Sequence, residues 1–429
     1  MATASSMLEL PDELLIKILD HLDVRFLVGS VSCVCQRLRH LSDSEHLWKK
    51  FCAQIWLDEE KKMCEDSWKA NFLAWHEKWG PYMDCYAGVK AQWNRIEAAL
   101  AERCPTTLSH LCGPVDKTLL QQACSMGESP LPPEVCCSFL IHNGQRVLLG
   151  QGSLLGTLEV YDHFSMEVAV PLGFSLKNSM PMRGNLMLSW CPYMNYGQAL
   201  CLRSKPGLER GCVYYLNDVG KPRRQEGYFI MAGSFIEWLE KLADRLSDPE
   251  LIVHRSKILR FYHEPTCVAV TRDVKVTVAT AFVPRMSQVR ADKMRTLFAY
   301  RISMTMDENA PSASTCKLQS RYWKITDSVG ECHEVKGEAV IGLYPVIKPG
   351  TNFSYASWTP FDCEGGFMEG HFTFVNLKSG ETYDVICPRF NMWCPQVSRA
   401  IGGEGTSEEV DYDEDDDEDY SEDEDDDEY

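Results

Sequence analysis

The chain has 429 residues, of which 45% are hydrophobic, so it holds enough apolar material for the cores of about two to four domains. Its formal net charge is −19, but the 18 acidic residues between Glu404 and Tyr429, where no Lys or Arg occurs, account for nearly all of it. The rest of the chain is close to neutral and lacks the basic footprint of a nucleic-acid-binding protein.

Targeting signals and metal motifs are not evident. No run of about 18 apolar residues predicts a membrane span, and Met1 to Ser6 do not resemble a secretory signal. The 19 cysteines form no C-x-x-C motif, and the close pairs Cys33 with Cys35 and Cys136 with Cys137 match no zinc site. We therefore expect reduced thiols, no bound metal, no membrane partner and a location in the cytoplasm and nucleus.

Residues 4–54 have a helical pattern. Pro11 stands in the first turn of a predicted helix, and Leu14, Ile18 and Leu22 follow at a spacing of four, which gives an apolar stripe. Two further apolar helical runs follow before position 56. Three short helices in about 50 residues bury little surface alone, so this segment must pack on another domain or on a partner chain.

The next two segments differ in character. Residues 55–105 are predicted to be a helical linker, because Trp68, Phe72, Trp75 and Trp79 recur at helical spacing and form a core face. Residues 106–260 read as an α+β domain. Within it, Ser234 and Glu237 have the spacing of a capping box at the start of a helix.

From about Cys267 the apolar period changes from 3.6 to 2. Several short alternating segments separated by Gly and Pro turns predict a β-sandwich over residues 265–397. A loop is predicted at Trp358-Thr-Pro-Phe361. Residues 402–429 are too acidic to form a core and are predicted to be a disordered tail, in which Ser421 suits an acidophilic kinase.

The first segment contains the pairs Leu10-Pro11, Leu14-Leu15, Val31-Ser32 and Leu47-Trp48. With these pairs at this spacing it resembles the F-box family, and the resemblance implies docking on a Skp-type adaptor and, through it, on a cullin and a RING subunit. The residues expected to bind the adaptor are Leu10, Pro11, Leu14, Leu15, Ile18, Leu22, Val31, Val34, Leu38, Leu47 and Trp48.

The sandwich segment contains the motifs Leu318 to Ile325, Glu334-Val335-x-Gly337, Pro349-Gly350, Phe353-x-Tyr355, Gly366-x-Met368-x-Gly370 and Pro388-Arg389-Phe390. With these motifs it resembles the ApaG family, and the resemblance implies a fibronectin-III-like fold. Residues 106–260 resemble the SUKH superfamily more weakly. The predicted fold is thus multidomain α + β: a helical F-box, a SUKH-like α+β domain, an immunoglobulin-like or fibronectin-III-like sandwich and an acidic tail.

We find no residues that indicate catalysis or cofactor binding. Bacterial ApaG proteins carry G-x-G-x-x-G, but this chain has Ala339 between Gly337 and Gly342, and Glu338 adds negative charge. Nucleophile elbows, phosphate loops and zinc-protease motifs do not occur. The sequence therefore predicts no catalytic residue, no metal and no cofactor.

These features favour a non-enzymatic substrate receptor of an SCF-type ubiquitin ligase that recruits client proteins for degradation. The alternative is a β-sandwich protein that senses a small ligand or phosphate. For client binding we expect Trp358 and Phe361 to contribute, because their segment is unusually apolar for a connector. The alternative for Trp358 is that its side chain belongs to the sandwich core.

Overall fold

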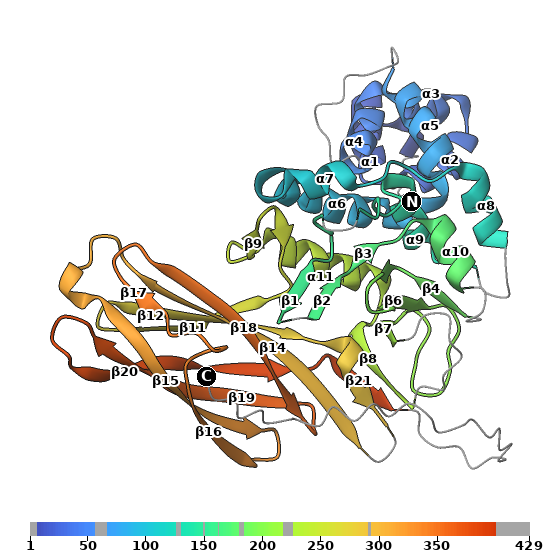
Figure 1. The fold of residues 1–429 in the computed structure, drawn as a ribbon. Coiled ribbons are helices and arrows are strands. Elements are labelled where there is room, and N and C mark those ends of the chain that lie inside the picture. Colours follow the sequence, from blue (N-terminus) through green and yellow to red (C-terminus); the bar gives the residue numbers. More distant parts are fainter. Residues whose placement is uncertain are drawn as a thin grey trace, which may run out of the picture.

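The computed structural model describes residues 7–55, 67–125, 130–148, 151–161, 163–179, 184–217, 226–290 and 293–399. Figure 1 shows a helical N-terminal part, a central α+β part and a C-terminal β-sandwich, which confirms the predicted fold class. The acidic tail, predicted to be disordered, lies outside the described residues. Within the described ranges, no helix has the length and apolar composition that a membrane span requires.

The N-terminal part consists of short helices held by side-chain hydrogen bonds. Its helices are α1 (Asp12–Leu19), α2 (Val24–Gly29), α3 (Gln36–Ser42) and α4 (Glu45–Ile55). Asp23 caps α2, because its Oδ1 accepts the backbone N–H groups of Arg25 and Phe26 at 2.8 and 3.0 Å. Arg37 at the start of α3 donates to the Leu10 carbonyl and to Asp12 Oδ1, which fixes α3 beside the start of α1.

An aromatic chain joins this part to the helices that follow. Trp48 of α4 packs on Phe72 of α5 (Trp68–Trp79) at 5.2 Å between ring centroids, and Trp75 packs on Tyr86 of α6 (Met83–Arg103) at 5.2 Å. Trp93 of α6 then donates to Ser138 Oγ in α9 (Pro133–Ile141) at 2.9 Å. A single apolar core therefore runs from the N-terminal helices into the central part.

In its described residues, the central part combines helices with short strands. The helices are α7 (Pro105–His110), α8 (Lys117–Ser125), α9 (Pro133–Ile141), α10 (Leu172–Ser179) and α11 (Phe235–Ser247). The strands are β1 (Thr157–Val160), β2 (His163–Met166), β3 (Val168–Ala169), β4 (Asn185–Met187), β5 (Ser189–Trp190), β6 (Tyr196–Cys201), β7 (Val213–Asn217), β8 (Gly227–Ala232), β9 (Val253–His254) and β10 (Lys257–Ile258). The predicted helix cap is present, since Ser234 Oγ accepts the N–H of Glu237 at 3.1 Å.

The central sheet is completed by the last described strand of the chain. Its order is β21-β8-β7-β6-β4, where β21 (Gln396–Arg399) pairs antiparallel with β8. Figure 1 shows β21, in red, beside β8. The sequence boundary at residue 397 did not anticipate this return, because four residues leave only a weak pattern.

The sandwich consists of two antiparallel sheets. One contains β11 (Tyr262–Thr271), β12 (Val274–Phe282), β13 (Gln288–Val289), β14 (Met294–Met306) and β18 (Asn352–Phe361). The other contains β15 (Cys316–Asp327), β16 (Cys332–Glu338), β17 (Val346–Ile347), β19 (Gly365–Asn376) and β20 (Thr382–Trp393). Trp323 and Phe390 lie in the core between the sheets, at 2% and 0% exposure.

Two glycines of the ApaG motif allow β19 to approach β15 closely. A Cβ atom at Gly366 would lie 2.2 Å from the Thr326 carbonyl oxygen, and one at Gly370 would lie 2.0 Å from the Tyr322 carbonyl oxygen. Any larger residue would push the strands apart, which explains the Gly366-x-Met368-x-Gly370 spacing in physical terms.

A buried ion pair stands where the central part meets the sandwich. Arg260, two residues before β11, lies 3.1 Å from Glu167 Oε2 and also donates to the hydroxyl of Tyr215 at 3.1 Å. Gln198 Nε2 donates to Glu167 Oε1 at 2.6 Å, and the Trp238 indole donates to Gln198 Oε1 at 2.7 Å. This network connects β6, β7 and α11 to the start of the sandwich.

Candidate functional sites

An apolar surface covers part of the N-terminal helices. Leu14 and Ile18 lie one turn apart on α1 and are 44% and 39% exposed, and Val34, in the turn before α3, is 67% exposed. The Arg37 hydrogen bonds hold the segment that carries Val34 beside the start of α1. We call Leu14, Ile18 and Val34, together with the exposed Pro11, the docking face.

The other residues predicted to bind an adaptor occupy different environments. Leu15, Leu38, Leu47 and Trp48 are buried in the core, and their role in adaptor binding stays a prediction. They support the docking face from below, and the Trp48 indole also donates to the Ser42 carbonyl at 2.9 Å. Three further residues are half-buried: Leu10, Leu22 and Val31.

Sequence reasoning missed two exposed apolar side chains on α2. Phe26 is 50% exposed and Val28 is 47% exposed. They are not part of the spacing that carries the family resemblance. The sequence signal was Asp23 followed by a short helix with apolar residues on several sides, because such a helix cannot bury all of them.

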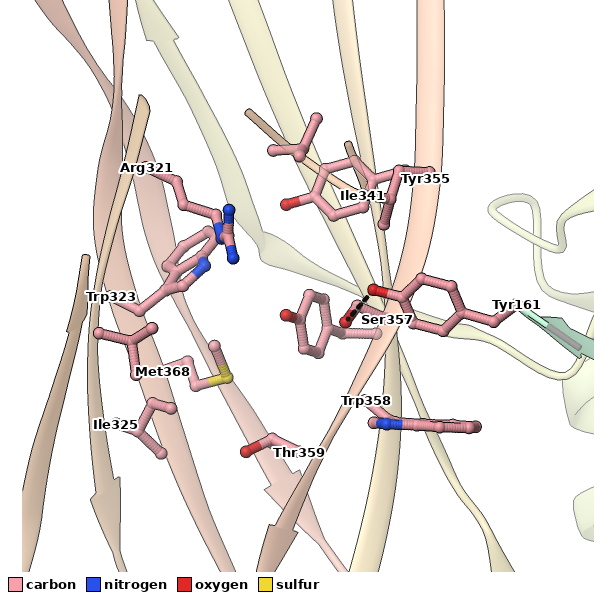
Figure 2. A pocket seen from close by; sticks show the side chains of 13 residues that line it. Tyr161, Arg321, Trp323, Ile325, Ile341, Tyr355, Ser357, Trp358, Thr359 and Met368 are labelled. Carbon is pink, nitrogen blue, oxygen red and sulfur yellow. Dashed lines mark hydrogen bonds between the residues drawn. The ribbon is translucent and has the colours of Figure 1, made fainter. Parts of the chain in front are cut away.

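A second candidate site is a cavity of about 210 Å³ at the mouth of the sandwich. Its walls come from β14, β15, β18 and β19, and Figure 2 shows Tyr161 of the β1–β2 turn reaching toward it from the central part. The Tyr161 hydroxyl lies 3.2 Å from Ser357 Oγ. The central part and the sandwich therefore both contribute to this cavity.

Polar groups are aimed into the cavity. Arg321 donates through Nη1 to the carbonyl oxygens of Glu338 and Ala339 at 2.7 and 2.9 Å, and Figure 2 shows its guanidinium turned inward. The Tyr355 hydroxyl is buried and has no hydrogen-bond partner within the described part of the chain, and burial raises the pKa of this phenol well above its ordinary value. A donor, an acceptor and aromatic walls suit a small polar group or a partner side chain.

The segment predicted to be a loop is a strand. Trp358 and Phe361 belong to β18, where they pair with Ala299 and Thr296 of β14. Phe361 is 6% exposed and packs edge-to-face on Phe298 at 5.9 Å, so it lies in the core, and its role as a client contact stays a prediction. Trp358 is half-buried, lines the cavity and packs on the ring of Tyr161 at 5.7 Å.

The segment from Gly337 to Gly342, which corresponds to the glycine motif of bacterial ApaG proteins, forms a strained turn. Ala339 and Ile341 have positive φ angles of 59° and 46°, and Val340 between them is fully buried. The carbonyl oxygens of Glu338 and Ala339 face Arg321, so this backbone presents acceptors where a phosphate needs donors. In the described ranges, no group of three or more His, Cys, Asp or Glu side chains could hold a metal ion.

Comparisons with known proteins agree with these parts. A family model described as F-box-like matches residues 7–54, and one described as ApaG domain matches residues 286–376. F-box only protein 3 of Homo sapiens is 33% identical over 415 residues, covering 94% of this chain and 87% of the human protein, and that of Bos taurus is 32% identical over 417 residues. Protein ApaG of Bradyrhizobium diazoefficiens is 38% identical over 133 residues, covering 31% of this chain and 97% of its own length.

Proposed function

Because the chain belongs to the F-box only protein 3 family, we propose that it is the substrate-recognition subunit of an SCF-type ubiquitin ligase. The F-box-like segment binds a Skp-type adaptor, which links it to a cullin and a RING subunit. The remaining domains bind client proteins. The chain acts in the cytoplasm and the nucleus, in line with the free thiols of all 18 cysteines in the described residues.

The docking face is the observation that carries this proposal. Leu14, Ile18 and Val34 remain in solvent although the core beneath them is complete, with Leu15 and Leu47 fully buried. Exposed apolar side chains in one small region are costly in a monomer and are expected where a partner helix packs.

The proposed mechanism is proximity. The receptor holds a client near the ubiquitin thioester of a recruited conjugating enzyme and raises the effective concentration of the client lysine. This role needs no nucleophile or general base in the chain, and we propose that the chain itself is not catalytic. Clients would contact the mouth of the sandwich, where Trp358 and Tyr161 form a half-exposed aromatic rim.

The competing interpretation, a β-sandwich protein that senses a small ligand, accounts for less of the molecule. The bacterial ApaG proteins match 31% of this chain, whereas the F-box only protein 3 relatives match 94% of it. The cavity beside Arg321 agrees with either interpretation. The N-terminal docking face agrees only with the interpretation as a substrate receptor.

The experiment that tests the proposal is co-purification of the adaptor with Leu14→Asp. A carboxylate placed in a dry interface costs on the order of 2–5 kcal/mol, so we expect the adaptor to be lost from the purified complex. Leu73→Asp is the matched control, because Leu73 lies on the neighbouring helix α5 and is 54% exposed. Full adaptor binding by Leu14→Asp, or equal loss in both variants, would contradict the docking face.

A further inference from the structure

A group of cations that form no ion pair with the described carboxylates lies at one end of the sandwich. Arg290, Lys293 and Arg295 belong to a hairpin in which β13 and β14 pair through Gln288 with Arg295 and Val289 with Met294. All three side chains are exposed, and none forms an ion pair with a carboxylate of the described residues. We call these three residues the basic hairpin.

The described part of the chain ends beside this hairpin. β21 ends at Arg399, which is exposed and lies opposite Gly227 of β8. The hairpin occupies the space that a side chain at 227 would need, because a Cβ atom there would lie 2.3 Å from Val289 Cγ1. Val397 of β21 packs in the same apolar cluster as Val289 and Met294, so the end of β21 and the hairpin are neighbours.

The sequence that follows has the opposite charge. Between Glu404 and Tyr429 there are 18 acidic residues and no basic one. Glu404 is five residues beyond Arg399, a span of at most about 18 Å when fully extended. A segment tethered this closely has an effective concentration near the hairpin in the mM range, so weak ion pairs suffice to hold it there.

We propose that the acidic segment 404–429 docks in cis on the basic hairpin, with Arg399 at the base of the contact. The occupant is this segment of the same chain, because it has the complementary charge and begins beside the site. Docking covers the cations, so an acidic segment of another protein must displace it to bind there. The inference does not depend on the identity of any client.

Zero-length carbodiimide cross-linking of the intact protein tests this directly, because it joins a lysine amine to a carboxylate only when the two are in contact. Lys293 is the reporter in the hairpin. Trypsin makes no cut between Ala400 and Tyr429, so the tail appears as one peptide joined to the peptide that contains Lys293. We expect this cross-link at low salt and its loss at about 1 M salt, where the Debye length is about 3 Å.

The variant Arg290→Glu with Arg295→Glu keeps Lys293 as reporter and removes the attraction. We expect the cross-link yield to fall about fivefold or more, the effect of losing two weak surface ion pairs. The matched control is Lys275→Glu with Lys324→Glu, the same charge change at exposed sites on β12 and β15, and it should leave the yield unchanged. Unchanged melting temperatures would show that both variants are folded.

Three outcomes would overturn the proposal. The first is an equal yield in the hairpin variant and the wild-type chain. The second is cross-linking of the tail to Lys336 on β16 as efficiently as to Lys293, which would indicate non-specific attraction. The third is a cross-link between differently labelled copies in a mixture of normal and ¹⁵N-labelled protein, which would place the tail on a second copy.

Discussion

At the scale of single residues, the buried ion pair of Glu167 and Arg260 is the contact in which each side chain most needs its partner. The two side chains are 1% and 6% exposed, so each charge has lost its water and depends on the other. Such a pair contributes little net stability, but removing one partner leaves an uncompensated buried charge.

We therefore expect Arg260→Met to destabilise the protein by about 3–5 kcal/mol. Glu167→Gln combined with Arg260→Met should recover part of this loss, because no buried charge is then left alone. Arg272→Met provides the comparison: Arg272 pairs with Glu381 at the surface, where both side chains are about half-exposed, so its loss should destabilise the protein far less than the loss of Arg260. Urea unfolding at neutral pH measures all three, and equal costs for Arg260→Met and Arg272→Met would contradict the argument.

A second residue pair predicts a pH dependence. His142 Nε2 lies 2.7 Å from Glu97 Oε1, and this hydrogen bond is the main reason that the pKa of Glu97 is lowered. A lowered carboxyl pKa means that the stabilisation is complete above the ordinary Glu pKa and disappears as the pH falls through the lowered value.

Glu97→Gln should thus cost about 1 kcal/mol at neutral pH, a modest value because the carboxylate is only partly buried. The difference from the wild-type chain should vanish in acid, below the lowered pKa of Glu97. Unfolding curves measured between acidic and neutral pH test this, with Glu102→Gln on the same helix as the control. A cost that is constant with pH would show that the contribution is not electrostatic.

At the scale of elements, the sequence predicts best where a pattern is long and local. The helix at Ser234 and the alternation in β14 were visible because a cap or a run of alternating residues lies within one segment. The strand that carries Trp358 was mistaken for a loop because Pro360 and the mixed residues around it resemble a turn. β18 tolerates Pro360 because it is an edge strand that, among the described strands, pairs only with β14.

The docking face shows a second limit of prediction from the sequence. The spacing of Leu14, Leu15 and Ile18 reveals an amphipathic helix, but it does not tell which leucine faces the core. The structure separates them, with Leu15 fully buried and Leu14 44% exposed. Packing against α3 and α4 determines which leucine is buried, and the spacing of apolar residues within one helix does not reveal that packing.

β21 gives a prediction at this scale. Val397→Asp places a charge in the apolar cluster with Phe229 and Val289, and we expect a loss on the order of 2 kcal/mol. Amides of β8 should then exchange with solvent faster, because their outer partner strand has detached. Gln396→Asp on the same strand is exposed and should change neither quantity. Unaltered exchange in β8 for Val397→Asp would mean that β21 does not hold this edge.

At the scale of the whole molecule, the N-terminal helices and the central part share one core that includes Leu15 at one end and Ile258 at the other. We expect them to unfold in one calorimetric transition. Leu47→Ala, at a fully buried site, should lower the temperature of that whole transition, with a cost of about 2–5 kcal/mol. A separate early transition that alone responds to Leu47→Ala would show that the F-box melts independently.

The position of β21 also governs the order in which the chain can be finished during synthesis. A nascent chain completed through residue 260 has β8 but lacks its outer neighbour, so the central sheet keeps an open edge while the sandwich is being made. The edge closes only after Arg399 has been added. Premature stop codons anywhere in the sandwich therefore leave a defect in the domain before it, and such products would be prone to aggregation through the exposed edge of β8.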